Sequence, residues 1–320
     1  MSPLGSWFAG ELPDAAIEMA SDRVSAAVVV YRDRRPVVAA HATEPLGSGV
    51  IVPSFTGTNV VDRAAAVDAL RRLIDRLPSR PRRVALVLPD SAAKVSLVRF
   101  DHVPARRDDL DQLVRWQIRK ALPFPIEDAV VTHTPGLSVG DGGRDYIAVA
   151  ARRSIVSEYE QLCEEIGAQP GIVDLATLSL INLFLAAGAA PPDDWLLVHV
   201  RADSTSIVIM RGMDVVFYRN RAEGEHDTLG ELVYQTTMYY QDRLSGGGFS
   251  RVLVAGIGRH ASAVDAVRRS VEEHLGLSVE LVEPTKIAAL ADRIAASADL
   301  LDVLGPLVGI SMRTVAGAAA

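Results

Sequence analysis

The chain has 320 residues, of which 49% are hydrophobic and 23% charged, so it can form two or three lobes with apolar interiors and is not largely disordered. Its formal net charge of -7 argues against nucleic-acid binding, because phosphate recognition needs clustered lysine and arginine. The single cysteine, Cys163, excludes an internal disulfide and a multi-cysteine metal site, and it is interpreted as a half-buried structural thiol in a reducing cytoplasm.

The N-terminal part of the sequence predicts strands followed by one helix. Residues 16–44 contain β-rich runs around short polar breaks, a pattern typical of a small antiparallel meander. Over residues 60–78 apolar residues recur three and four positions apart, which predicts an amphipathic helix that Pro78 ends. The segment "PSRPRR" at residues 78–83 then indicates a boundary between lobes.

A second unit begins near residue 84. Two strands around a turn are expected before a helix over residues 106–122, whose first turns are acidic and whose last turn is basic, as the helix dipole favours. Pro123 and Pro125 prevent this helix from continuing. The unit is completed by a strand and a helix, at residues 144–152 and 154–167.

A third unit follows an apolar helix from about Asp174 to Ala187 and the linker "AGAAPPDDW". It is expected to contain a strand hairpin, a long helix, a buried strand, a helix and a short strand, at residues 196–220, 227–248, 251–256, 261–275 and 279–284. A meander followed by helices therefore occurs twice in the chain. The sequence has no signal-peptide pattern and no run of about 18 uncharged apolar residues, so any membrane contact is expected to be peripheral.

This doubled arrangement, with a β-α-β unit inserted into its first half, is similar to that of the actin-like superfamily. The stretch "VRWQIRKALPFPIEDAVVTH" at residues 114–133 resembles the PilM family of type IV pilus assembly proteins, relatives of FtsA, at that family's helix, PFP turn and following strand. Residues 146–184 and 233–258 resemble further elements of the same family. The resemblance therefore covers essentially the whole chain.

The resemblance implies an α/β fold: an actin-like (ribonuclease H-like, duplicated) two-lobe clamshell with an inserted FtsA-type 1C (SHS2-like) domain. The C-terminal stretch from Leu300 is expected to be a helix that closes the first lobe, because its single basic residue, Arg313, suits an anionic membrane surface poorly. The implied domains are lobe 1A at 7–80, completed by 170–190 and 305–320, the inserted domain at 81–168, and lobe 2A/2B at 193–304.

The resemblance also implies a nucleotide site in which two hairpin turns hold phosphates, with glycine where the backbone must approach closely and aspartate to place magnesium. In the first turn Glu18 replaces the aspartate and Ala20 the glycine. In the second turn His199 and Arg201 take the same two places. Ala176 replaces a helix glutamate that orients the attacking water in related ATPases.

These replacements predict a pseudo-ATPase without catalytic residues or a metal site, and with no cofactor or at most ATP with magnesium at low affinity. Arg201 either binds phosphate or fills the vacated space and pairs with Glu18, and the second alternative is favoured. His199 is expected to be a packed hairpin residue. The groups that could still meet a nucleotide are Glu18, Ser21, Asp22, Asp203, Ser204, Thr205, Gly256 and Gly258, although the two glycines also fit a plain strand-to-helix turn.

The partner that the resemblance implies is the N-terminal cytoplasmic peptide of a PilN-like bitopic membrane protein, bound in a groove between the first lobe and the inserted domain. Such peptides bind through main-chain hydrogen bonds and apolar anchors. The alternative is that Trp116 and Leu122 form the core face of their helix, and for either residue taken singly this alternative is favoured. The candidate contacts are Trp116, Arg119, Leu122, Pro123, Phe124 and Ile126.

The implied function is a non-enzymatic cytoplasmic scaffold, peripheral at the inner membrane through its partner. It would connect a type IV pilus platform, or a related secretion platform, to other platform and motor components. The alternative is an active actin-like ATPase or small-molecule kinase of the same fold. Self-association is left open, and no nucleic-acid partner is expected.

Overall fold

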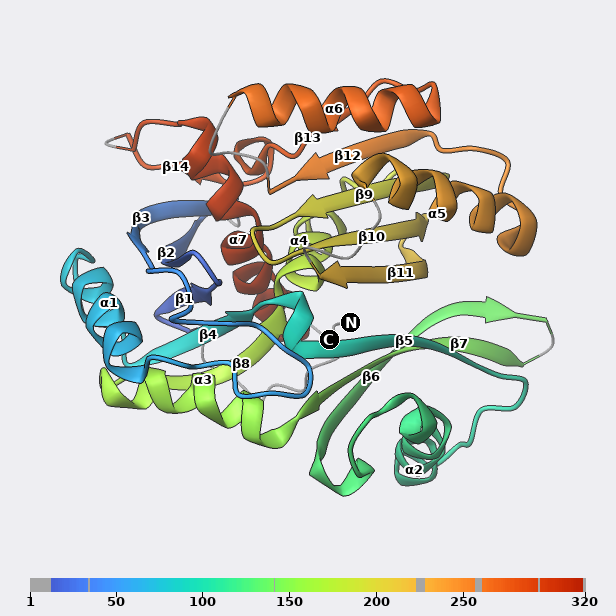
Figure 1. The fold of residues 1–320 in the computed structure, drawn as a ribbon, viewed down its shortest axis with the longest axis horizontal. Helices are drawn as coiled ribbons and strands as arrows, with labels where there is room; N and C mark the ends of the chain where they lie inside the picture. Colours follow the sequence, from blue (N-terminus) through green and yellow to red (C-terminus); the bar gives the residue numbers. More distant parts are fainter. Residues whose placement is uncertain are drawn as a thin grey trace.

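The computed structural model describes residues 13–33, 35–140, 142–222, 228–256, 261–292 and 294–318. In these ranges the strands form a six-stranded, a five-stranded and a three-stranded sheet, with helices packed against each (Figure 1). The strand order is β14-β3-β2-β1-β4-β8 in the first sheet, β11-β10-β9-β12-β13 in the second and β5-β7-β6 in the third.

The first sheet begins with the antiparallel meander that the sequence predicts, and two later strands then join it in parallel beside β1. Helices pack against both sides of this sheet (Figure 1). The strands are β1 (Ala15–Met19), β2 (Arg23–Arg32), β3 (Arg35–Pro45), β4 (Arg83–Leu88), β8 (Gln169–Leu175) and β14 (Ala289–Leu290). The helices are α1 (Arg63–Asp75) and α3 (Arg153–Glu165) on one side and α4 (Ala176–Ala186) and α7 (Ala298–Ala318) on the other.

Two glycines of α7 allow that helix to lie close to α4. A Cβ atom at Gly305 would stand 2.8 Å from Cδ1 of Leu180, and one at Gly309 would overlap the carbonyl oxygen of Ser179. The described C-terminal residues thus pack against α4 and the first sheet, as the sequence predicts for a closing helix. None of the helices in the described ranges is both long enough and apolar enough to span a membrane.

The second sheet is built on the hairpin that follows the linker. β9 (Asp194–Val200) pairs with β10 (Ser204–Arg211), which in turn pairs with the edge strand β11 (Asp214–Ala222). The remaining elements are β12 (Arg251–Ala255), β13 (Glu280–Leu281), α5 (Leu229–Leu244) and α6 (Ala261–Leu275). Thr228 and Glu231 cap α5 reciprocally, each accepting from the backbone N–H of the other, which fixes where this helix begins.

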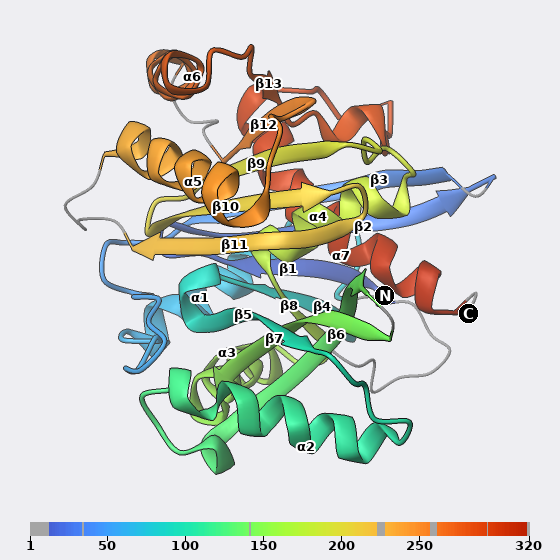
Figure 2. The ribbon, with the colours of Figure 1, turned by 90° about the vertical axis from the view of Figure 1, so that its right-hand side faces the viewer.

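The third sheet belongs to the inserted unit and lies beside the edge strand β11 of the second sheet (Figure 2). Its elements are β5 (Ala93–Phe100), β6 (Ala129–Val139), β7 (Gly143–Arg152) and α2 (Arg107–Ile118). Short 3-10 turns at 90–92, 119–121, 126–128 and 284–286 complete the described elements. The predicted helix over 106–122 is therefore α-helical only to Ile118, and a 3-10 turn precedes the proline-rich segment.

The expected limits of the domains remain predictions, and residues 7–12 of the first range lie outside the described part of the chain. Ala289–Leu290, inside the range expected for the second lobe, pairs with β3 at the edge of the first sheet. Cys163 is fully buried in the core of the first lobe, and burial raises the pKa of its thiol to about 12. It is therefore an inert structural thiol, more deeply buried than the sequence indicates.

Candidate functional site

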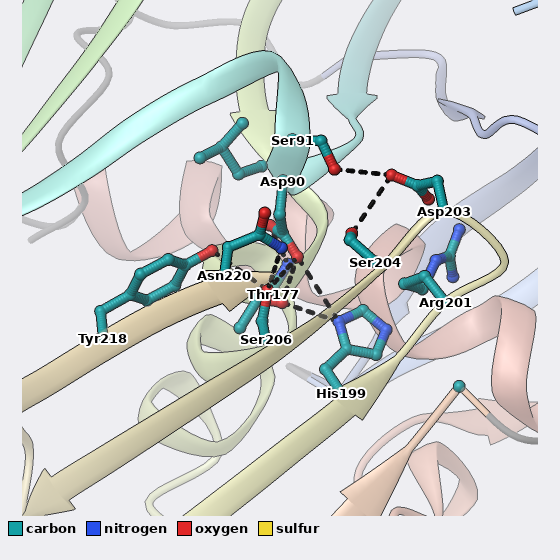
Figure 3. A network of polar contacts seen from close by, with 12 residues as sticks. Asp90, Ser91, Thr177, His199, Arg201, Asp203, Ser204, Ser206, Tyr218 and Asn220 are labelled. Atoms are coloured by element: carbon teal, nitrogen blue, oxygen red, sulfur yellow. Dashed lines mark hydrogen bonds and ion pairs between the residues drawn. The ribbon is translucent and has the colours of Figure 1, made fainter. Parts of the chain in front are cut away.

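The two turns expected to hold phosphates are linked to each other across the junction of the first and second sheets. The first turn joins β1 to β2, and Ala20 donates its backbone N–H to Arg23 there. The second joins β9 to β10, and Arg201 donates its backbone N–H to Ser204. Figure 3 shows the second turn with the polar residues that surround it.

Arg201 bridges the two turns. Its Nη2 donates to Oε1 of Glu18 at 2.6 Å, and the two side chains are only 7% and 1% exposed. Arg23 also approaches Glu18, with 3.9 Å between its Nη2 and Oε2 of the carboxylate. The interpretation that Arg201 fills the vacated space and pairs with Glu18 is confirmed by this geometry.

The charges around Arg201 are predominantly negative. Burial by itself lowers the pKa of this guanidinium, but Glu18 and three aspartates, Asp302, Asp203 and Asp22, together raise it above its usual value. Two arginines, Arg201 and Arg23, therefore face four carboxylates. Burial raises the pKa of Asp302, but even with that group neutral the carboxylates outnumber the arginines.

A buried polar network lies next to this ion pair. Asp90 accepts hydrogen bonds from the backbone N–H of Thr177 at 3.0 Å, from Oγ of Ser206 at 2.9 Å and from Oγ1 of Thr177. Nδ1 of His199 lies 2.8 Å from Oγ1 of Thr177 (Figure 3). Burial and, to a lesser extent, the neighbouring Asp203 raise the pKa of Asp90, although its hydrogen bonds from Thr177 and Ser206 act in the opposite direction.

His199 is packed in this network, as the sequence predicts, and is 1% exposed. Burial and the charges of Arg201 and Arg23 hold its pKa well below the usual value, so the imidazole is neutral. With the Thr177 hydroxyl donating to Asp90, Nδ1 of His199 is the donor to Thr177, and Nε2 has no hydrogen-bond partner among the described residues. A neutral ring cannot supply the negative charge of the aspartate that it replaces.

The network also connects the inserted unit to the second lobe. Ser91, in the 3-10 turn that follows β4, donates to Oδ2 of Asp203 at 2.7 Å. Asp90 in the same turn accepts from Ser206 of β10. The sequence analysis did not single out Asp90, Ser91 or Ser206. Asp90 and Ser91 could have been found from the sequence, because they are two consecutive polar residues just after the buried strand β4.

The other predicted nucleotide contacts are in part engaged with their own chain. Asp22 pairs with Arg23 at 3.2 Å, and Oγ of Ser204 donates to Asp203 at 3.2 Å. The backbone N–H of Gly256 donates to Oδ1 of Asp302 at 2.5 Å. Three predicted contacts remain: Ser21 is partly buried in the first turn, Thr205 is in the backbone ladder between β10 and β9, and Gly258 lies outside the described residues.

Gly256 can be only glycine in this backbone. Its φ of +92° is in the left-handed region, and a Cβ atom there would overlap the carbonyl oxygen of Val200. The residue therefore fits a close approach between β12 and the end of β9, whether or not a ligand is bound. In the described side chains no cluster of three or more His, Cys, Asp or Glu could hold a metal ion.

The predicted partner-binding residues occupy two settings. Trp116, Arg119 and Ile126 line a hollow of about 310 Å³ in the inserted unit together with Arg115 and Glu127. Trp116 is 55% exposed, so the alternative that it lies on the core face of its helix is wrong. The core of the inserted unit is closed instead by residues that include Val114 and Ile118.

Phe124 lies in the other setting, at the contact of the inserted unit with the first lobe. Its ring centroid is 5.0 Å from that of Phe55, in the loop between β3 and α1, and the Arg152 guanidinium lies 5.8 Å from the Phe124 ring. Leu122 packs in part against the core of the inserted unit, and Pro123 is exposed.

Comparison with known proteins agrees with this architecture. A family model described as type IV pilus assembly protein PilM matches residues 16–245. The solved structure of a PilM-PilN type IV pilus biogenesis complex is similar with a TM-score of 0.77 and 19% identity, over 96% of this chain and 99% of that chain. A protein of Bacteroides thetaiotaomicron with an actin-like ATPase fold and unknown function is similar with a TM-score of 0.50 and 10% identity, over 92% of this chain and 95% of that chain.

These likenesses confirm the α/β, actin-like fold that the sequence predicts. A comparison with curated proteins gave no match.

Proposed function

The chain belongs to the type IV pilus assembly protein PilM family, and from that premise we propose that it is a scaffold that binds a membrane partner and does not turn over nucleotide. It acts in the cytoplasm, peripheral at the inner membrane. Its partner is the N-terminal cytoplasmic peptide of a PilN-like bitopic protein. The wider assembly is the inner-membrane platform of a type IV pilus or of a related secretion system, with its motor components.

The observation that carries the pseudo-ATPase part of this proposal is the buried ion pair of Arg201 with Glu18. A phosphate group at the second turn would have to displace Arg201 and leave Glu18 buried without its principal countercharge. Breaking a buried pair in this way costs about 3–5 kcal/mol. A nucleotide triphosphate would also enter a region where carboxylates outnumber arginines, which is unfavourable for an anion.

The residues present do not fit a magnesium nucleotide, so no catalytic step is assigned to them. His199 is neutral where a carboxylate would position hydrated magnesium. Asp203 is held by Ser91 and Ser204, and the N–H of Gly256 is held by Asp302. The hydrogen bonds of Asp203 with Ser91 and of Gly256 with Asp302 connect distant segments of the chain and occupy these groups without a ligand, as a scaffold without nucleotide would require.

The contact of Phe124 with Phe55 supports a peptide groove between the inserted unit and the first lobe. Arg152 reinforces this contact by donating from Nη1 to the carbonyl oxygen of Thr56 at 3.1 Å. Two valines that bracket the same first-lobe loop, Val52 and Val61, are 47% and 62% exposed. Exposed apolar side chains beside a braced loop are suitable anchors for an extended peptide.

The name of the similar solved structure, a PilM-PilN complex, supports the same kind of partner. For the groove we retain Phe124, Leu122 and Pro123 among the predicted contacts, because they follow α2 toward the first lobe. Trp116, Arg119 and Ile126 surround a separate hollow and are treated below.

Two calorimetric titrations test the proposal. In the first, magnesium-ATP is added to the full chain, and no binding is expected up to about 1 mM. A dissociation constant of 1 mM corresponds to a binding free energy of only about 4 kcal/mol. In the second, the N-terminal peptide of the PilN-like protein of the same organism is added, with and without ATP. We expect binding that ATP does not change.

Micromolar ATP binding would refute the pseudo-ATPase part and favour the alternative of an active ATPase or small-molecule kinase. Failure of the peptide to bind would refute the proposal that a PilN-like protein is the partner. The variant Phe124→Ala is expected to weaken peptide binding at least tenfold, because it removes the ring that meets Phe55. Gln117→Ala, an exposed position on α2, is the matched control and should bind as the wild type does.

A further inference from the structure

Trp116 is a large aromatic side chain that the core of the inserted unit does not use. Val114 and Ile118, two positions before and after it on α2, are 0% and 3% exposed and close that core. Two positions along an α-helix correspond to a rotation of about 200° around its axis, so Trp116 points away from the side that Val114 and Ile118 bury. A tryptophan side chain combines a large apolar surface with one N–H donor, and such side chains are enriched at interfaces.

The Trp116 ring is held in place and forms one wall of the hollow of about 310 Å³. The Arg119 guanidinium lies 5.4 Å from the ring centroid, so a cation-π contact limits the rotation of both side chains. Ile126, which follows the proline-rich turn, contributes a second apolar wall. A hollow of this size accommodates one or two side chains of a ligand rather than a folded partner.

The charges around this hollow have the opposite sign to that of the whole chain. Three cations, Arg115, Arg119 and Lys120, lie in the last turn of α2 and the 3-10 turn that follows. No carboxylate in the described part of the chain lies within the 4.0 Å that defines an ion pair with any of them, although Glu127 also lines the hollow. Some surface arginines of the chain do form ion pairs; Arg72 and Arg76, for example, both contact Glu44.

We propose that this hollow, separate from the groove at Phe124, is a docking site for an acidic peptide segment with an apolar anchor residue. The anchor lies between Trp116 and Ile126, and neighbouring carboxylates of the segment contact Arg115 and Arg119. Arginine suits this role because its fork of N–H groups matches a carboxylate in two parallel hydrogen bonds. The unpaired cations provide the charge complementarity for such a segment and increase its association rate.

An anionic membrane surface fits the same cations less well. Asp108 and Asp109 are exposed in the first turn of the same helix, and Glu127 and Asp128 follow the hollow. A flat anionic surface would meet these carboxylates together with the cations. A short peptide in the hollow contacts the basic end of α2 and, of these four carboxylates, only Glu127 lines the hollow.

The test uses the full chain and two pools of fluorescein-labelled hexapeptides, measured by fluorescence anisotropy. One pool carries Asp or Glu at four positions and Leu or Phe at two, and the other carries Lys or Arg in place of the acids. We expect the acidic pool to bind at least tenfold more tightly than the basic pool. The substitutions Trp116→Ala and Arg119→Glu should each weaken binding of the acidic pool at least tenfold, whereas the matched control Gln117→Ala should leave that binding unchanged.

Several results would overturn the proposal: no binding of the acidic pool up to 1 mM, equal binding of both pools, or full binding by Trp116→Ala. A loss in Phe124→Ala as large as in Trp116→Ala would show that the two sites are one. Pelleting with vesicles of 30% phosphatidylglycerol that depends on Trp116 would assign the surface to lipid. An oligomer in sedimentation velocity that Trp116→Ala disperses would assign it to a second copy of the chain. Both variants change exposed side chains, and circular dichroism should show an unchanged fold.

Discussion

Replacement of Arg201 by alanine is expected to lower the free energy of unfolding by about 3 kcal/mol. The substitution leaves the carboxylate of Glu18, which is 1% exposed, without the guanidinium that contacts it at 2.6 Å. Removing one member of a buried ion pair costs about 3–5 kcal/mol, because the other charge remains desolvated. The lower end of that range applies here, because Arg23 lies 3.9 Å from the same carboxylate and can move toward it.

The measurement is urea unfolding of the wild type and the variant, followed by circular dichroism and by tryptophan fluorescence. Urea is preferred to guanidinium chloride because a salt screens the interaction under test. Agreement between the two probes is needed, since a chain with several lobes can unfold in more than one step. Arg71→Ala is the matched control: its pair with Asp68 is at the surface, where such pairs contribute at most about 1 kcal/mol.

A double substitution separates the ion pair from the general loss of a long side chain. Glu18→Gln with Arg201→Met removes both charges and keeps similar volumes, so it is expected to be closer in stability to the wild type than Arg201→Ala is. Additive effects of the two single changes, or a stability of Arg201→Ala equal to that of the wild type, would refute the view that Arg201 is the essential partner of Glu18.

Three further predictions concern the buried network and the packing of α7. Because burial raises the pKa of Asp90 above its unfolded value of about 3.9, the wild type loses stability as the pH rises from that value through the folded pKa, so Asp90→Asn should gain stability relative to it above about pH 4 in urea melts. Burial lowers the pKa of His199, so the wild type should lose stability as the pH falls below about 6.5, and His199→Gln should reduce that slope; equal slopes would contradict the neutral, buried imidazole. Gly309→Ala would press a Cβ against the carbonyl of Ser179 and should cost about 1–3 kcal/mol by calorimetry, whereas Gly57→Ala, in an exposed loop, should be near neutral.

Most of the helices could be predicted from sequence because their apolar periodicity also defines their buried faces. α1 lies within its predicted range, α3 begins one residue before its predicted range of 154–167, and the bounds of α6, Ala261–Leu275, agree with the prediction. The end of α2 was harder to predict. A proline prevents a helix from passing it but does not determine how the preceding turns are wound, and residues 119–121 form a 3-10 turn.

The candidate site could be predicted only in part. The two turns were recognised, and the charge of Glu18 together with the loss of a glycine at Arg201 was enough to suggest their pairing. Trp116 shows the opposite case, because its place in an amphipathic pattern suggested the core and the structure leaves it 55% exposed. Val114 and Ile118, four positions apart, form the buried face of α2, and Trp116 lies midway between them on the opposite face.

By itself the sequence determined the local structure of this protein and showed which residues stand at the glycine and aspartate positions of the two predicted phosphate turns. Both depend on residues a few positions apart: the strands and helices follow from periodicity, and a missing glycine or aspartate is visible wherever the turn lies. Only the tertiary structure decided what replaced the nucleotide contacts. Glu18, Asp90, Thr177 and His199 come from four distant segments, and their hydrogen bonds exist only because the first sheet, the inserted unit and the second sheet meet at one buried junction.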